Sequence, residues 1–132
     1  MIKYKKRRTY KYNLHSDHSY DTKITVEHPQ DLGLLKITSS GMLTINKGYS
    51  WDGPSGPTFD SSNFMQGSLV HDALYQLIRE GVLPTDERKR ADEIMREICL
   101  QDGMSKFRAW YLYRGVRRFG ASSAKADLLI AP

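Results

Sequence analysis

The spacing of apolar residues changes once along the chain, and this change constrains the fold more than any other feature. In the first third, short segments alternate between apolar and polar side chains, at residues 23–27, 34–38 and 42–46. From residue 64 onward, apolar residues recur every three or four positions. Alternation is typical of half-buried strands, and the longer period is typical of amphipathic helices. The sequence therefore predicts an α+β fold, with N-terminal antiparallel hairpins forming a sheet and then a three-helix unit.

The predicted sheet belongs to residues 1–47. Its strands are residues 3–14, 23–27, 34–38 and 42–46, and its polar connections are residues 15–22 and 28–33. Ser39, Ser40 and Gly41 are typical turn residues, so they join the last two strands as a hairpin. Strands joined by such a short turn run antiparallel.

The helical part is predicted over residues 64–119. Its helices are residues 64–80, 85–101 and 105–119. Ser62 or Asn63 caps the first helix, and Thr85 or Asp86 caps the second. The short turn at residues 81–84 makes the first two helices an antiparallel pair. The aromatic residues of the third helix are interpreted as core residues, namely Phe107, Trp110, Tyr111 and Tyr113.

Residues 48–63 interrupt both patterns. This stretch of 16 residues contains three glycines and two prolines, as an irregular loop does. Loops of this length are often functional. With a small tail at residues 120–132, we interpret the 132-residue chain as a single domain.

Cysteine content and charge narrow the class of protein. The single cysteine, Cys99, excludes an internal disulfide and a zinc site built on several cysteines. The sequence predicts neither a signal peptide nor a membrane-spanning segment. The net charge is +5, and residues 1–11 and 106–118 are basic without any acid. Such basic patches can bind nucleic acid, anionic lipid or an acidic protein, or they can simply be solvated surface.

Four residues form the constellation that best supports chemistry. His71, Asp72 and Tyr75 lie within about one turn of the first predicted helix. His71 and Tyr75 are four positions apart and share a face, whereas Asp72 points about 100° away. Asp92 follows His71 by 21 residues and reaches a similar height on the antiparallel second helix. We therefore expect Asp92 to accept a hydrogen bond from His71.

This arrangement suits hydrolysis. A carboxylate can hold the histidine ring and stabilise its protonated form, while the other ring nitrogen deprotonates water. Asp72 could hold a cation that neutralises a developing oxyanion. Calcium suits such a position because it prefers oxygen ligands and readily takes backbone carbonyls from a glycine-rich loop.

At these residues the sequence resembles a phage and prophage family of unknown function. Its members pair a T-D-G-A-S-x-P-like loop with an H-D-x-L-Y helix and an R-x-x-A-D segment. Here these motifs correspond to residues 51–57, 71–75 and 89–92. The resemblance implies a phage protein. Because the sequence predicts neither a signal peptide nor a membrane-spanning segment, we expect it in the host cytoplasm or the virion.

The same stretch is similar to the catalytic core of phospholipase A(2), above all the disulfide-free versions from parvovirus capsids. The resemblance implies that His71 is the general base, that Asp92 is its partner and that Tyr75 supports the pair. It makes Asp72 the calcium carboxylate, with carbonyls near Trp51, Gly53 and Ser55 completing the shell. Two departures stand out in the loop: residue 55 is serine where many calcium loops have glycine, and Asp52 adds a carboxylate.

Three functions remain open from the sequence. The first is a calcium-dependent hydrolase of a phospholipid or another ester, acting at an anionic lipid surface. The second is a non-enzymatic phage structural or host-interaction protein that keeps the helix pair as a scaffold. The third, a nucleic-acid binder, ranks lowest because no recognised motif for nucleic acid occurs.

Each site residue also has a purely structural interpretation. His71 could be a half-buried histidine with Asp72 solvated or capping, and Tyr75 could be a core aromatic with a bonded hydroxyl. Asp92 could pair with Lys89 or Arg96 on its own helix. Asp52 is a natural turn residue.

Overall fold

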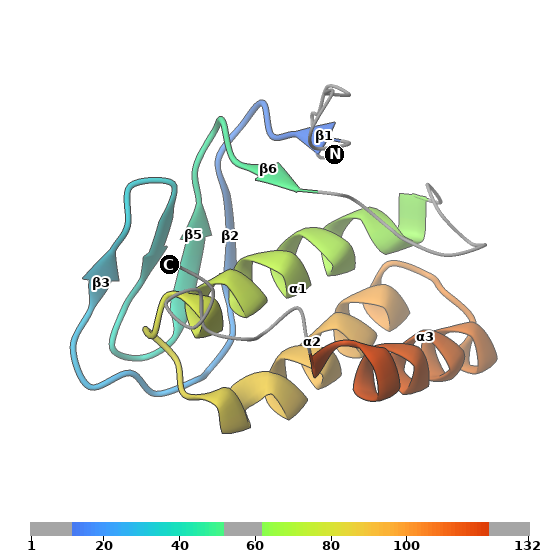
Figure 1. Cartoon of the computed structure of the whole chain (residues 1–132). Helices are drawn as coiled ribbons and strands as arrows, with labels where there is room; N and C mark the ends of the chain where they lie inside the picture. The colour runs from blue at the N-terminus through green and yellow to red at the C-terminus, as the bar shows by residue number, and fades with distance from the viewer. Residues whose placement is uncertain (1–11, 52–61, 122–132) are drawn as a thin grey trace, which may run out of the picture. The chain divides into compact units, whose positions relative to one another are not determined.

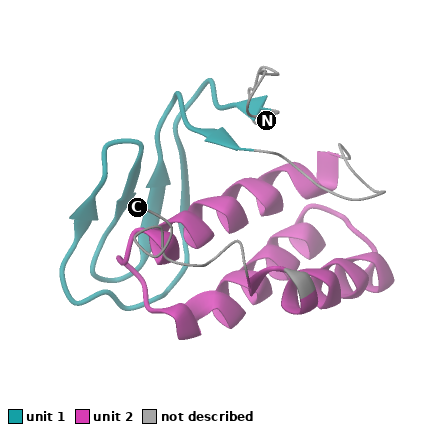
Figure 2. Ribbon diagram, in the orientation of Figure 1, with its two compact units in different colours: residues 1–59 teal, residues 60–132 magenta. Residues whose placement is uncertain are grey.

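The structure is a computed structural model, and it describes residues 12–51 and 62–121. The chain divides into two compact units, Met1–Phe59 and Asp60–Pro132 (Figure 2). The first unit contains all the strands in the described residues, and the second contains the helices (Figure 1). The predicted α+β class, with antiparallel strands followed by three helices, is confirmed.

The N-terminal unit contains two antiparallel sheets. The larger has the strand order β2-β5-β4-β3, and the smaller pairs β1 with β6. The strands are β1 (Tyr12–Asn13), β2 (His18–Asp21), β3 (Gln30–Asp31), β4 (Leu35–Ile37), β5 (Met42–Ile45) and β6 (Ser50–Trp51). Residues 48–63, predicted as a loop, therefore include strand β6 at Ser50–Trp51.

The hairpin of β4 and β5 forms as the sequence predicts. Leu35 lies opposite Ile45, and all the apolar residues of this pair on one face are buried: Leu35, Ile37, Leu43 and Ile45. Gly41 closes the turn with a positive φ of 100°. A Cβ atom at this position would lie 2.5 Å from the backbone nitrogen of Ile24, so only glycine fits without a shift.

The predicted strand at residues 23–27 is wrong. The chain pairs with β5 earlier, through β2, in a stretch predicted to be a polar connection. Lys23 has a positive φ of 60°, which takes the backbone out of the extended conformation after β2. Ile24 and Val26 are buried nonetheless, so their alternation reflects burial without ladder pairing. Of the predicted strand at residues 3–14, residues 3–11 lie outside the described part.

The C-terminal unit contains three helices: α1 (Ser62–Arg79), α2 (Arg88–Gln101) and α3 (Lys106–Phe119). Helix α1 ends at Arg79, and Gly81 follows with a positive φ of 81° and donates its N–H to the carbonyl of Ile78. Ser105 caps α3, where its side chain accepts a hydrogen bond from the backbone N–H of Arg108. Helices α1 and α2 run antiparallel (Figure 1).

Two predicted helix starts differ from the structure. Ser62 and Asn63, predicted as caps, already belong to α1. Thr85 and Asp86 form a short 3₁₀ helix, η1 (Thr85–Glu87), which leads into α2. A tight 3₁₀ turn is common at a helix N-terminus. The predicted and observed starts of a helix can therefore differ by one or two residues.

The helices pack through a small apolar cluster. Its buried members come from all three helices and the turn before α3: Phe64, Met95, Cys99, Met104 and Ala109. Leu112 and Val116 of α3 pack against this cluster. Within residues 12–51 and 62–121, no helix combines the length and apolar character needed to cross a bilayer.

Candidate functional site

The candidate site is centred on the carboxylate of Asp92, which is fully buried in the C-terminal unit. Helix α2 carries Asp92 on its buried face, and α1 carries His71 and Tyr75 one turn apart. The antiparallel pairing of the two helices brings these three side chains together. The contact between His71 and Asp92 expected from the helix lengths is present.

Both oxygens of the Asp92 carboxylate are engaged. Its Oδ1 atom lies 2.7 Å from Nε2 of His71 and accepts a hydrogen bond of 2.6 Å from the hydroxyl of Tyr75. Its Oδ2 atom accepts a hydrogen bond of 2.9 Å from Nη1 of Arg117. A second guanidinium, that of Arg88, lies 3.7 Å from Oδ2. A buried carboxylate with this many donors keeps its charge.

This environment determines the charge state of Asp92. Burial by itself would raise the pKa of its carboxyl group, but the hydrogen bonds from His71, Tyr75 and Arg117 outweigh burial and lower the pKa below its ordinary value. The carboxylate can only accept hydrogen bonds, so the Nε2 atom of His71 carries the hydrogen between them. The Nδ1 atom of neutral His71 is consequently a proton acceptor.

The imidazole of His71 is held firmly and remains slightly accessible. Its side chain is 10% exposed, and its ring lies 4.2 Å from the ring of Tyr75 between centroids. The Nδ1 atom lies 3.9 Å from Oδ1 of Asp72, too far for a hydrogen bond but close enough for an electrostatic effect. Burial lowers the pKa of His71, yet the carboxylates of Asp72 and Asp92 overcome this and raise it above the ordinary value.

The phenol of Tyr75 donates its hydrogen bond to Asp92, and its oxygen accepts one from Arg88. Burial and the nearby carboxylate of Asp92 raise its pKa well above the usual value for tyrosine. The hydroxyl therefore stays protonated and orients the carboxylate.

Arg88 and Arg117 belong to the site although the sequence did not single them out. Nη1 of Arg88 donates to the Tyr75 hydroxyl at 3.3 Å and to the carbonyl of Val116 at 3.1 Å. Its Nη2 atom donates to the carbonyl of Arg117 at 3.1 Å. The i,i+4 spacing of Arg88 and Asp92 could have indicated the ion pair between these two side chains. Nothing in the spacing of Arg117 points to Asp92, 25 residues away.

The two arginines tie the last turn of α3 to the site. The last carbonyls of a helix lack partners within the helix. Arg88 satisfies two of them, and Arg117 from the same turn reaches the carboxylate. The geometry of Asp92 thus depends on all three helices.

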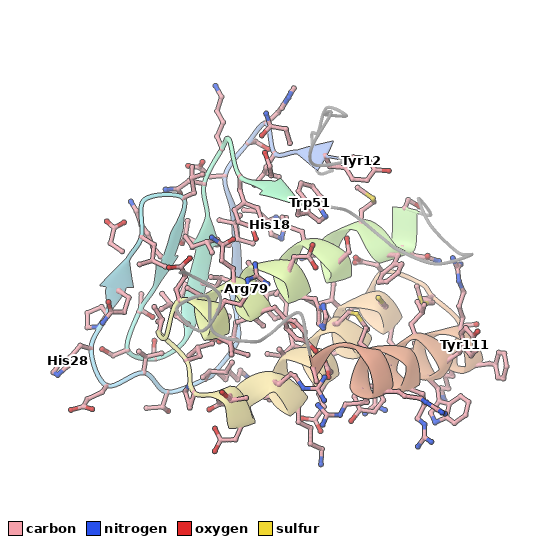
Figure 3. The ribbon with its side chains drawn as sticks, in the orientation of Figure 1. Tyr12, His18, His28, Trp51, Arg79 and Tyr111 are labelled. Carbon is pink, nitrogen blue, oxygen red and sulfur yellow. The ribbon has the colours of Figure 1, made fainter. Side chains whose placement is uncertain are left out.

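The predicted metal ligands are only partly within the described residues. Asp72 lies on α1 with its side chain 36% exposed, and its carboxylate is the hard oxygen donor that calcium prefers. Trp51 belongs to β6 of the N-terminal unit, where it is buried with its ring 5.6 Å from that of Tyr12 (Figure 3). Asp52, Gly53 and Ser55 lie outside the described residues. Among residues 12–51 and 62–121, no three or more His, Cys, Asp or Glu side chains form a metal-binding group.

The chain belongs to the family described as "Protein of unknown function (DUF1353)", whose family model matches residues 34–116. The matched region contains His71, Asp72, Tyr75 and Asp92, together with Arg88. No curated protein and no solved structure matches the chain significantly.

Proposed function

We propose that this member of the family hydrolyses an ester bond with His71 as the general base. The observation that carries the proposal is the 2.7 Å contact between Nε2 of His71 and the buried carboxylate of Asp92. A carboxylate on one ring nitrogen fixes the tautomer that makes the other nitrogen basic, and it stabilises the imidazolium that forms.

The residues of the chain would act in sequence. Nδ1 of His71 takes a proton from a water molecule as the water oxygen attacks the ester carbonyl. Asp92 stabilises the resulting imidazolium, and Tyr75 keeps the carboxylate oriented. The imidazolium then returns its proton to the leaving alcohol, so the ring is neutral again at the end of the cycle.

The chemistry of Asp72 supports a cation beside this base. Its partly exposed carboxylate is an oxygen donor on the Nδ1 side of His71. Calcium takes six to eight oxygen ligands, so backbone carbonyls and water would have to supply the rest. When bound, such a cation would neutralise the oxyanion that develops on the substrate.

The substrate class follows from the resemblance to phospholipase A(2). It favours a phospholipid over other esters, and the related resemblance favours a phage context. In this proposal the ester is presented at an anionic lipid surface.

Release of fatty acid from anionic phospholipid vesicles tests the proposal. We expect release in the presence of calcium, and we expect the variant His71→Ala to lose it. The matched control is His28→Ala, since the side chain of this histidine is 78% exposed in the other unit and lies 3.6 Å from the carboxylate of Glu27, which is also exposed. Full activity in His71→Ala, together with normal activity of the control, would refute the assignment.

Calcium itself is tested by thermal unfolding. A bound ion stabilises the folded state, so calcium should raise the Tm. The variant Asp72→Asn should abolish this increase. An unchanged Tm of the native chain at millimolar calcium would remove calcium from the proposal.

One observation favours the second function, a non-enzymatic scaffold. Asp92 receives donors from α1 and α3, and such a buried network can brace three helices without any reaction. In that case His71→Ala would lower the Tm and leave vesicle lipids intact in both forms. The native chain's activity therefore separates the two functions.

A further inference from the structure

Helix α3 carries a row of five aromatic and basic side chains on one face. We call this row the α3 stripe, and its members are Phe107, Trp110, Tyr111, Arg114 and Arg118. They follow the spacing i, i+3, i+4, i+7 and i+11, which places them on one side of a helix. All five are exposed.

The exposure of the three aromatics is unusual. Phe107 is 74% exposed, Trp110 is 50% exposed and Tyr111 is 53% exposed. Their interpretation as core residues is therefore wrong. The opposite side of α3 faces the apolar cluster instead, through Ala109. Large apolar side chains gathered on an exposed face indicate an interaction surface.

The stripe is also positive, because two of its five members are Arg114 and Arg118. Helix α3 carries five basic residues and no acidic one: Lys106, Arg108, Arg114, Arg117 and Arg118. The guanidinium of Arg114 lies 5.7 Å from the centre of the Trp110 ring, and the rings of Phe107 and Trp110 are 6.3 Å apart. Phe107, Trp110 and Arg114 thus lie side by side along the stripe, and Tyr111 projects outward from α3 (Figure 3).

We propose that the α3 stripe docks the protein on an anionic phospholipid bilayer. A helix that lies in the membrane interface places aromatic rings at the headgroup level and basic side chains against anionic lipid. Each basic residue near such a surface is attracted by its negative potential. This inference extends the proposed function. Only one part of it rests on that function, namely that the docked lipid is the substrate.

The stripe and the site share one helix. Arg117 leaves α3 on the side of Asp92, while Arg114 and Arg118 belong to the stripe. Docking through α3 would therefore hold the last turn of the helix, which Arg88 and Arg117 connect to the carboxylate.

A bilayer fits the stripe better than nucleic acid does. Proteins that bind single strands use a positively charged groove with aromatic rings as stacking platforms. The stripe instead lies on the outer surface of one helix. Phe107 offers no hydrogen bond, and its large exposure suits the hydrocarbon boundary.

Co-sedimentation of the full chain with vesicles tests the inference. One set of vesicles contains phosphatidylglycerol with phosphatidylcholine, and the other contains phosphatidylcholine alone. We expect binding to the anionic vesicles that weakens with salt. The double variant Phe107→Ala/Trp110→Ala should bind at least about tenfold more weakly, because each ring loses apolar burial. Alanine favours helix, so circular dichroism should remain that of the native chain.

Two matched controls separate the stripe from general effects. Arg114→Glu should weaken binding, whereas Lys89→Glu makes the same charge change at an exposed position of α2 and should not. Leu32→Ala removes an apolar side chain that is 43% exposed in the N-terminal unit and should bind like the native chain.

The outcomes distinguish this inference from the proposed function. Vesicle binding by the native chain without hydrolysis of any ester refutes the hydrolase and leaves the docking surface standing. Hydrolysis of a soluble short-chain ester without vesicle binding does the reverse. Equal vesicle binding by the aromatic double variant overturns the inference. The inference is also overturned if the native chain binds labelled oligonucleotides through the stripe and does not bind vesicles.

Discussion

The replacement Asp92→Asn tests the buried network most directly. The substitution keeps the shape of the side chain and removes its negative charge. Three donors then lose a charged acceptor: His71, Tyr75 and Arg117. Arg88, at 3.7 Å from the same carboxylate, loses its opposite charge.

The size of the effect follows from how deeply each partner lies. The Asp92 side chain is 0% exposed and that of His71 is 10% exposed, so their interaction has little screening. The Arg117 side chain is 31% exposed, and its share should be below about 1 kcal/mol. Removing one partner of a buried ion pair costs about 3–5 kcal/mol. The free energy of unfolding of a typical domain is about 5–15 kcal/mol, so the loss should be a large fraction of the total.

Urea unfolding followed by circular dichroism measures this loss near neutral pH. The matched control is Glu93→Gln, the same chemical change at the next position of α2. Glu93 forms only a loose ion pair with Arg90 at 3.9 Å, with both side chains partly exposed. Its replacement should cost less than about 0.5 kcal/mol. A loss below about 1 kcal/mol in Asp92→Asn, equal to that of the control, would refute the reasoning.

Three further predictions concern the same unit. The raised pKa of His71 and the lowered pKa of Asp92 make their pairing fully stabilising between the ordinary values of 3.8 and 6.5. Stability should fall as pH rises through the raised pKa of His71, and a Tm series against pH should lose this fall in His71→Gln. Burial raises the pKa of Cys99 to about 12, so alkylation by iodoacetamide near pH 8 should be at least about tenfold slower in the folded chain than in urea. A methyl group at Gly67 would lie 2.8 Å from Sγ of Cys99, whereas one at Gly115 meets nothing within 4 Å. Gly67→Ala should therefore lower the Tm because overpacking costs about 1–3 kcal/mol, and Gly115→Ala should raise it through the helix propensity of about 1 kcal/mol.

The helices were predictable because their apolar spacing and their end signals agree. The first two helices are long enough, and their connection short enough, for simple arithmetic on rise per residue to bring His71 and Asp92 to one height. The 2.7 Å contact in the structure is the result of that geometry. A short antiparallel helix pair is a local arrangement, so its contacts can be reached from the sequence.

The strands were predicted less well because alternation reports burial and does not report pairing. Ile24 and Val26 are buried and alternate with exposed residues, yet the ladder partner of β5 is the more polar β2. The positive φ of Lys23 separates the two segments, and lysine gives no hint of this conformation. A tertiary constraint here overrides a local pattern.

The contact of Arg117 with the site could not be predicted from the sequence, for a different reason. Arg117 contacts Asp92 only because α3 folds back along α2, and the direction of that return depends on packing around Met95 and Ala109. The sequence showed that α3 is basic and aromatic. It did not show which side faces the cluster, and the exposed aromatics were consequently assigned to the core.

The two oxygens of Asp92 have different partners, and this division determines which experiment can establish function. Oδ1 accepts hydrogen bonds from His71 and Tyr75, whereas Oδ2 accepts one from Arg117 of α3. Replacing Asp92 removes both sets of contacts at once, so a loss of activity in that variant would follow from either catalysis or bracing. His71 contacts the carboxylate through Oδ1. Its Nδ1 atom lies 3.9 Å from Oδ1 of Asp72, which is beyond hydrogen-bond distance. Replacement of His71 can therefore abolish hydrolysis while Arg117 still holds the carboxylate, and only that combination would assign the histidine to chemistry.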